Sequence, residues 1–159
     1  MTSGCHQVYL NNKLQVADIL RWILEQTGPA DVRISSFSIS DEFLHRLHFI
    51  REDGLLHSLK IVLDFKATHK TLKLWPFIRQ DVEFCHLADN HSKVLLISND
   101  SWTVTMVTSQ NLTRGNRFEA GAIFTDPATF GTMSQLLDDM ITYYSFRFND
   151  VFDTAIGED

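Results

Sequence analysis

Along the first half of the chain, the spacing of apolar side chains alternates between the period of a helix and the period of a strand. From Leu14 to Glu25, apolar side chains recur every three or four residues, which predicts a helix that Gly28-Pro29 ends. Residues 32–39 instead alternate apolar with small polar side chains, as a strand does. The elements expected next are a helix capped by Ser40 or Asp41, a strand at 59–65, a short helix at 68–74 that Pro76 should break or restart, and a strand at 82–87.

The second half of the chain predicts a run of strands and then one long helix. Residues 93–98 and 103–108 flank a turn-rich trio, so we expect a hairpin, and residues 120–124 form a further strand. Asp126-Pro127 supplies an N-cap and a first-turn proline for the last helix. The apolar face of that helix consists of Met133, Leu136, Leu137, Met140, Ile141 and Tyr144. Residues 8–10 are a candidate strand behind a loose terminus at 1–7.

This order predicts an α/β fold with a mixed central sheet sandwiched by helices. The sequence contains no internal repeat and no low-complexity linker, so we expect a single domain over residues 1–159. A chain of 159 residues buries enough surface to fold without a disulfide or a metal.

Charge and cysteine content narrow the function classes. The net charge of −6 argues against a surface that attracts nucleic acid everywhere, although a local basic patch remains compatible with it. Cys5 and Cys85 do not have zinc-site spacing, and Cys85 lies in an apolar run that predicts a buried thiol. Neither a secretory signal nor a run of 18 apolar residues is present, so we expect a cytoplasmic protein that does not enter a membrane.

Candidate chemistry begins at His91-Ser92-Lys93. Two residues apart on a strand, the histidine and the lysine would share one face. Imidazole is a good nucleophile and proton donor near neutral pH, and a neighbouring ammonium can bind a phosphate oxygen. With seven histidines in the chain, an H-x-K pair also arises by chance, and a surface loop is the alternative reading.

Three further side chains fit phosphoryl transfer. Ser109 and Asn111 are again two residues apart, and their hydroxyl and amide can donate to phosphate oxygens. Glu119 could accept from a histidine ring N–H and so fix its tautomer. Together with His91 and Lys93, these residues fill the roles that the chemistry needs without a metal or cofactor.

The full pattern of H-x-K, apolar strand, hairpin, S-x-N and glutamate resembles the phospholipase D superfamily signature. The resemblance covers most of the chain and implies the fold of that superfamily. Two positions depart from the pattern: the family's aspartate position holds Ser98, with Asp100 two places later, and the glycine before the serine is Thr108. The aspartate is the more dispensable, structural member of the family's set.

Because the chain holds one motif, it resembles the short single-motif nucleases of that superfamily. The resemblance implies a metal-independent phosphodiesterase acting on DNA or RNA through a phosphohistidine on His91. It also implies a homodimer with one shared active site, in which Lys93 and Asn111 hold the phosphate, Ser109 supports it and Glu119 orients a His91. The alternatives are a catalytically silent nucleic-acid-binding or regulatory module and a lipid phosphodiesterase, which the missing second motif disfavours.

Several side chains other than these five are candidates for substrate binding or for packing. Substrate binding is expected from Arg114 and Arg117 inside the motif loop and from Lys66 and Lys70 in a basic stretch, which could also be a solvated helix face. His86 is expected to be packed or at a pocket rim. The aromatic tail from residue 143 to residue 152 predicts core packing beneath the sheet, with a dimer face as the alternative.

Overall fold

Eight strands and four α-helices make up the computed structural model, which describes residues 1–2 and 4–148. In chain order, the elements are β1 (His6–Asn11), α1 (Val16–Thr27), β2 (Ala30–Ser35), α2 (Asp41–Glu52), β3 (Leu56–Asp64), the 3-10 turn η1 (Phe65–Ala67), α3 (Thr68–Asp81), β4 (Phe84–Ala88), β5 (Val94–Ser98), β6 (Thr103–Thr108), β7 (Glu119–Phe124), α4 (Pro127–Tyr144) and β8 (Ser145–Arg147).

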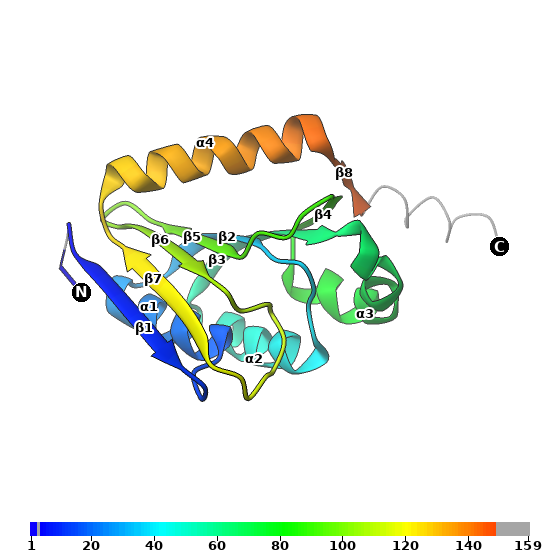
Figure 1. The fold of residues 1–159 in the computed structure, drawn as a ribbon, viewed down its shortest axis with the longest axis horizontal. Coiled ribbons are helices and arrows are strands. Elements are labelled where there is room, and N and C mark those ends of the chain that lie inside the picture. The colour runs from blue at the N-terminus through cyan, green and yellow to red at the C-terminus, as the bar shows by residue number, and fades with distance from the viewer. Residues whose placement is uncertain (3, 149–159) are drawn as a thin grey trace.

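All eight strands belong to one sheet with the order β1-β7-β6-β5-β2-β3-β4-β8. The β2, β3 and β4 strands are mutually parallel, and the remaining neighbours are antiparallel. Helices α1, α2 and α3 cover one face of the sheet, whereas α4 alone crosses the other (Figure 1). The predicted mixed sheet sandwiched by helices is therefore confirmed, and so is the β5–β6 hairpin.

Two clusters of buried side chains hold these layers together. The larger fills the space between the sheet and helices α1 to α3, and the apolar stripe predicted for the first helix enters it through Ile19, Leu20 and Ile23. The smaller lies under α4, where Leu137 packs on Val94 and its neighbours in the sheet. Cys85 is buried in the larger cluster, as the sequence predicted.

The prediction that Pro76 breaks or restarts a short helix at residues 68–74 was wrong. Helix α3 continues through Pro76 to Asp81. A proline inside a helix costs about 3 kcal/mol. Trp75 and Ile78 lie beyond the expected end at residue 74 and are both buried. Burial of one such side chain contributes roughly 1.5–3 kcal/mol, so packing of this segment offsets the local cost of the proline.

The ends of the chain are more ordered than the sequence suggested. Strand β1 begins at His6, and the Gly4 amide donates to the Thr125 carbonyl at 3.3 Å, so the expected loose terminus is in part paired with the sheet. At the other end, β8 adds an edge strand that the sequence did not predict. Phe148 packs edge-on against Trp75, whereas residues 149–152 of the aromatic tail lie outside the described residues.

One predicted strand is shorter than expected. Strand β2 ends at Ser35 rather than at Ile39, and Ile39 instead forms a single parallel bridge with Leu112. In the described ranges, none of the helices combines the length and apolar character needed to cross a membrane.

Candidate active site

The candidate site lies at one end of strands β5 and β6, where two loops meet. The first loop follows β4 and carries His91 and Lys93, and the second follows β6 and carries Ser109 and Asn111. Strands β5 and β6 pair antiparallel, so the start of one lies beside the end of the other. This register brings together residues that are about 20 positions apart in the sequence.

An open pocket of about 530 Å³ lies between these loops. Its lining consists of His91, Lys93, Ser109, Asn111, Arg117, Phe118 and Glu119. The structure therefore places all five residues of the H-x-K…S-x-N…E pattern around one cavity, together with one of the four predicted substrate-binding residues.

His91 and Lys93 contact each other by a route that the sequence did not predict. Strand β5 begins only at Val94, so the pair precedes the strand rather than sharing one of its faces. Lys93 folds back instead, with its Nζ 3.3 Å from His91 Nδ1 and 2.5 Å from the His91 carbonyl oxygen. Partial burial lowers the pKa of Lys93, and the negative charge of Glu119 opposes that shift. This arrangement leaves Nε2 of His91 as the ring nitrogen that can meet a substrate.

Glu119 holds Ser109 within the chain. The Ser109 hydroxyl donates to Glu119 Oε2 and also accepts from the Ala120 amide at 3.1 Å. The sequence predicted a histidine ring as the partner of this carboxylate. The observed bond instead fixes the serine at the start of the loop that connects β6 to β7.

Asn111 has unused hydrogen-bonding capacity. Its Oδ1 is buried and has no hydrogen-bond partner among the residues that the structure describes. Buried polar atoms are nearly always paired, and rotation of the amide by 180° exchanges its acceptor for a donor. Asn111 can therefore form a hydrogen bond to a ligand in the pocket.

A buried polar network behind the pocket was missed at the sequence level. The Asn90 side chain donates to Ser35 Oγ at 2.9 Å and to the Ser36 carbonyl at 3.2 Å, and its Oδ1 accepts from the Ser92 amide at 2.9 Å. The backbone amide of Asn90 in turn donates to Asp64 Oδ2 at 2.8 Å. The network fixes the loop that carries His91. Its one sequence signal is that Asp64 and Asn90 stand at or just beyond the ends of neighbouring parallel strands.

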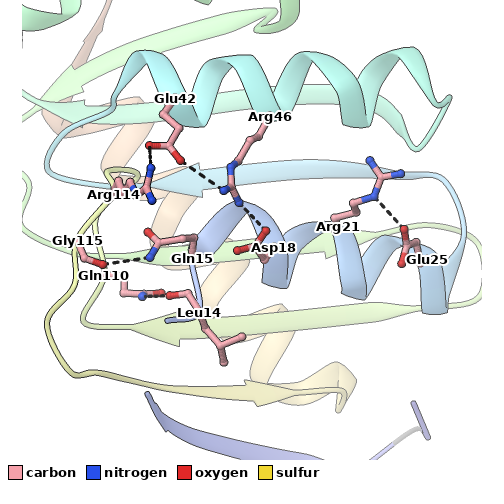
Figure 2. Close-up of polar contacts among 10 residues, drawn as sticks. All are labelled: Leu14, Gln15, Asp18, Arg21, Glu25, Glu42, Arg46, Gln110, Arg114 and Gly115. Carbon is pink, nitrogen blue, oxygen red and sulfur yellow. Dashed lines mark hydrogen bonds and ion pairs between the residues drawn. The ribbon is translucent and has the colours of Figure 1, made fainter. Parts of the chain in front are cut away.

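The second loop is tied to the helical layer below the sheet (Figure 2). The Gln110 side chain donates to the Leu14 carbonyl at 2.6 Å, and the Gln15 side chain donates to the Gly115 carbonyl at 3.1 Å. The middle residue of the S-x-N segment and Gly115, four residues beyond that segment, are thus anchored just before the start of α1. The loop is held in place by tertiary contacts that local sequence does not reveal.

The four predicted substrate-binding residues separate into two groups. Arg117 lines the pocket, whereas Arg114 points toward α2 and pairs with Glu42 at 3.5 Å (Figure 2). Lys66 in η1 and Lys70 in α3 also lie outside the pocket lining. His86 belongs to another cavity, beneath α4, where its Nδ1 lies 3.1 Å from Ser145 Oγ.

Comparison with known proteins gives a fold but no sequence family. No protein-family model matches the chain, and neither does any curated protein sequence. Among solved structures, polyphosphate kinase from Porphyromonas gingivalis is similar, with a TM-score of 0.61 and 11% identity, covering 89% of this chain and 23% of that one. Phosphatidylserine synthase from Haemophilus influenzae matches with a TM-score of 0.57 and 13% identity, covering 90% of this chain and 39% of that one.

A third similar structure is TrmBL2, described as an archaeal chromatin protein with a novel mode of DNA binding. Its TM-score is 0.58 at 12% identity, and the match covers 87% of this chain and 52% of TrmBL2. The chain thus spans about half or less of each of these three proteins. At such identity the likeness shows the fold alone: polyphosphate kinase and phosphatidylserine synthase have the phospholipase D fold, which confirms the fold class that the motif predicted.

Proposed function

We propose that this chain is a phosphodiesterase that cleaves DNA or RNA without a metal ion, through a phosphohistidine intermediate on His91. The observation that carries the proposal is the convergence of His91, Lys93, Ser109, Asn111 and Glu119 on one open pocket. Likeness in fold to a polyphosphate kinase and a phosphatidylserine synthase supports phosphoryl-transfer chemistry in general. The nucleic-acid substrate is the more specific part of the proposal.

In the first step, His91 Nε2 attacks the phosphorus of a phosphodiester. A nitrogen–phosphorus bond forms, and the bond from phosphorus to the leaving oxygen breaks. Lys93 and Asn111 donate to the non-bridging oxygens and offset their growing negative charge. The leaving oxygen needs a proton, which His91 of the partner subunit supplies as a general acid.

In the second step, a water molecule hydrolyses the phosphohistidine. His91 of the partner subunit is now neutral and takes a proton from the water, whose oxygen attacks phosphorus and releases His91. Within the described ranges, one chain lines the pocket with a single histidine, whereas the two steps use two. A homodimer that shares one site between two chains supplies the second histidine.

The chemistry is tested by comparing two histidine variants in the presence of EDTA. We expect wild-type cleavage of DNA or RNA to survive chelation and His91→Ala to lose it by at least about a thousandfold, since nucleophile and proton donor disappear together. His86→Ala is the matched control, because His86 lies in the separate cavity under α4. Acid-labile phosphate on His91 after a quench supports the intermediate, and loss of activity on chelation contradicts the mechanism.

Substrate class is tested with DNA, RNA and phospholipid side by side. Arg117 lines the pocket, and Arg114, Lys66 and Lys70 are the further candidates for phosphate contacts along a strand. Contacts of this kind release counterions, so affinity for nucleic acid should fall steeply with salt. Cleavage of the lipid alone would move the chain out of the nuclease class.

A second candidate function is a nucleic-acid-binding or regulatory module without catalysis. Ser98 stands where the family signature has aspartate, and TrmBL2 is described by its DNA binding. Under this function, His91→Ala would bind nucleic acid with the wild-type affinity, and the wild type would cleave none of the substrates above.

A further inference from the structure

The candidate site shares its end of the sheet with the loops that follow β2 and β3. Ser35 ends β2 and pairs with Val94 at the start of β5, and Val94 pairs with Val107 near the end of β6. On the other side of β2, Ser35 pairs with Val62, and β3 ends two residues later at Asp64. The strand order β6-β5-β2-β3-β4-β8 therefore places the loops after β6, β2 and β3 along one end of the sheet.

Phe37, in the loop after β2, contacts the proposed nucleophile. Its ring centroid lies 5.6 Å from that of His91, with 58° between the two planes. The Phe37 carbonyl accepts from the backbone amide of Asp64 at 3.2 Å, and Asp64 Oδ2 accepts from the backbone amide of Asn90. Three segments that are distant in the sequence thus hold a phenyl ring beside His91.

A stacked pair of rings continues from this point toward the edge of the sheet. Phe65 directly follows Asp64, and its ring stacks on that of Phe146 in the edge strand β8, with the centroids 5.3 Å apart and 24° between the planes. Both side chains remain open to solvent, since Phe65 is 40% exposed and Phe146 is 43% exposed. Aromatic rings gain further contact by stacking, so an exposed pair can accept another flat ring.

Phe118 is the aromatic side chain on the other side of His91. It lines the pocket directly before β7 and is 69% exposed. We call Phe37, Phe65, Phe118 and Phe146 the ring row. Because His91 shares the pocket with Phe118 and contacts Phe37, the ring row passes through the candidate site.

Positive charge accompanies the ring row. Lys66 directly follows Phe65, Lys70 lies in the first turn of α3, and Arg117 lines the pocket with Phe118. All three cations are exposed, and within the described ranges none of them is paired with a carboxylate. Their charge is therefore available to a phosphate group that lies along the row.

We infer that the ring row stacks on the unpaired bases of a single-stranded nucleic acid and so presents one of its phosphodiesters to His91. The inference rests on the proposed function, because it takes His91 as the nucleophile toward that phosphodiester. Unpaired bases can be splayed apart and stacked on aromatic side chains, whereas a duplex keeps its bases stacked on one another. A duplex would thus offer phosphates to the cations but no base to the rings.

The mixture of rings and cations favours this ligand over an apolar one. Rings alone would suit an acyl chain or an apolar protein surface equally well. Nucleic acid alternates flat bases with phosphates, and the ring row alternates with cations in the same way. A single strand is therefore the ligand that uses both kinds of side chain.

The test measures binding to the His91→Ala variant, which leaves the nucleic acid uncleaved. Fluorescence anisotropy follows labelled oligothymidylate or oligouridylate, each alone or annealed to its complement. Phe65→Ala and Phe146→Ala each remove a ring in this background, and Phe65→Leu keeps apolar volume without a π-face. Phe49→Ala is the matched control, since Phe49 on α2 is 51% exposed and its ring also contacts another ring, that of His45 at 4.9 Å. Circular dichroism melting checks the fold of each variant.

We expect the parent variant to bind the single strand at least about tenfold more tightly than the duplex. Each ring substitution should raise the single-strand dissociation constant by about 5- to 150-fold and leave the duplex value unchanged. Phe49→Ala should bind both ligands as the parent does. Equal affinity for single strand and duplex, or folded ring variants that keep the parent's affinity or weaken both ligands equally, would overturn the inference.

The ring row and the proposed function fail separately. If the wild type cleaves no phosphodiester but binds single strands through the rings, the ring row stands as a binding site and only the proposed function is rejected. If the wild type cleaves single strand and duplex at the same rate, and Phe65→Ala cleaves as the wild type does, the reaction stands and the ring row is rejected.

Discussion

The Tyr9 ring lies across Gly121, where β1 and β7 leave no room for another side chain. The two residues are paired, and a Cβ on Gly121 would lie 2.5 Å from Tyr9 Cε1. The ring thereby reaches Thr108 on β6, with 2.7 Å between Tyr9 Oη and Thr108 Oγ1. Burial raises the pKa of Tyr9, the bond to Thr108 lowers it, and the charge of Glu119 raises it further, which keeps the hydroxyl protonated. The position of Ser109, the next residue, therefore depends on a glycine on another strand.

Gly121→Ala should destabilise the protein by about 1–3 kcal/mol, since the added methyl group displaces the Tyr9 ring. Urea unfolding measures the difference in free energy. Gly131→Ala in α4 is the matched control: nothing lies within 4 Å of its Cβ position, and alanine in a helix should stabilise by about 0.5–1 kcal/mol. Equal effects of the two substitutions would mean that Tyr9 does not pack against Gly121 as the structure has it.

The two cysteines should differ in reactivity. Burial raises the pKa of Cys85 to about 12, because a thiolate cannot be solvated inside the core. At pH 8 the native protein should thus react through the partly exposed Cys5 alone, and the unfolded protein through both thiols. Titration with a chromogenic disulfide counts the reactive groups. Two fast thiols in the native state would contradict the packing of β4.

At the scale of one loop, Asn90 is the residue on which the position of His91 depends. Asn90→Ala removes the donor to Ser35 and the acceptor for Ser92, so we expect a loss of about 1–3 kcal/mol in stability and a fall in kcat. Asn99→Ala is the control, because Asn99 also bridges backbone groups, from Thr27 to Trp102, but in the β5–β6 turn. Urea unfolding and kinetics on a nucleic-acid substrate separate the two.

We expect Asn99→Ala to lose stability while its kcat remains at the wild-type value, whereas Asn90→Ala should lose both stability and kcat. If the two variants lost kcat equally, Asn90 would act through overall stability alone. An unchanged KM for Asn90→Ala would further indicate that the loop positions His91 for reaction rather than for binding.

Elements that depend on local periodicity could be predicted from the sequence, and elements that depend on distant partners could not. The stripe of α1 and the hairpin are local patterns, and both were predicted. Continuation of α3 past Pro76 depends on the burial of Trp75 and Ile78, and β8 depends on pairing with β4. Neither condition is visible in a short window of sequence.

The same division applies to the candidate site. The spacing of the motif places His91 and Asn111 on two loops that the hairpin register brings together. The supporting contact from Asn90 to Asp64 requires that β3 and β4 be neighbours, which the order of elements alone does not determine. Arg114 illustrates the same limit, since its place in the motif loop predicts a phosphate contact but does not reveal the ion pair that it forms with Glu42 on α2.

On the scale of the whole molecule, the sheet is covered unequally. Three helices pack on one face and α4 alone on the other (Figure 1), and the Val8 and Leu10 side chains of β1 are largely exposed. The larger part of the core is complete within one chain. Under the proposed function, the pocket would be complete only in a homodimer, so activity would depend on protein concentration.

A shared site also predicts how activity depends on the composition of a mixed dimer. When wild type and His91→Ala are mixed in equal amounts and the subunits exchange, about a quarter of the dimers contain two wild-type chains. Only these have both histidines. At the same total protein concentration, activity should therefore fall to about a quarter of that of pure wild type, whereas independent sites would retain about half. Measuring the cleavage rate across mixing ratios gives a quadratic or a linear curve. Mixing with His86→Ala, which leaves the pocket intact, should give no loss at any ratio. A linear curve after proven exchange would show that each chain catalyses alone, and the second histidine would then have to be replaced by a proton donor within one pocket.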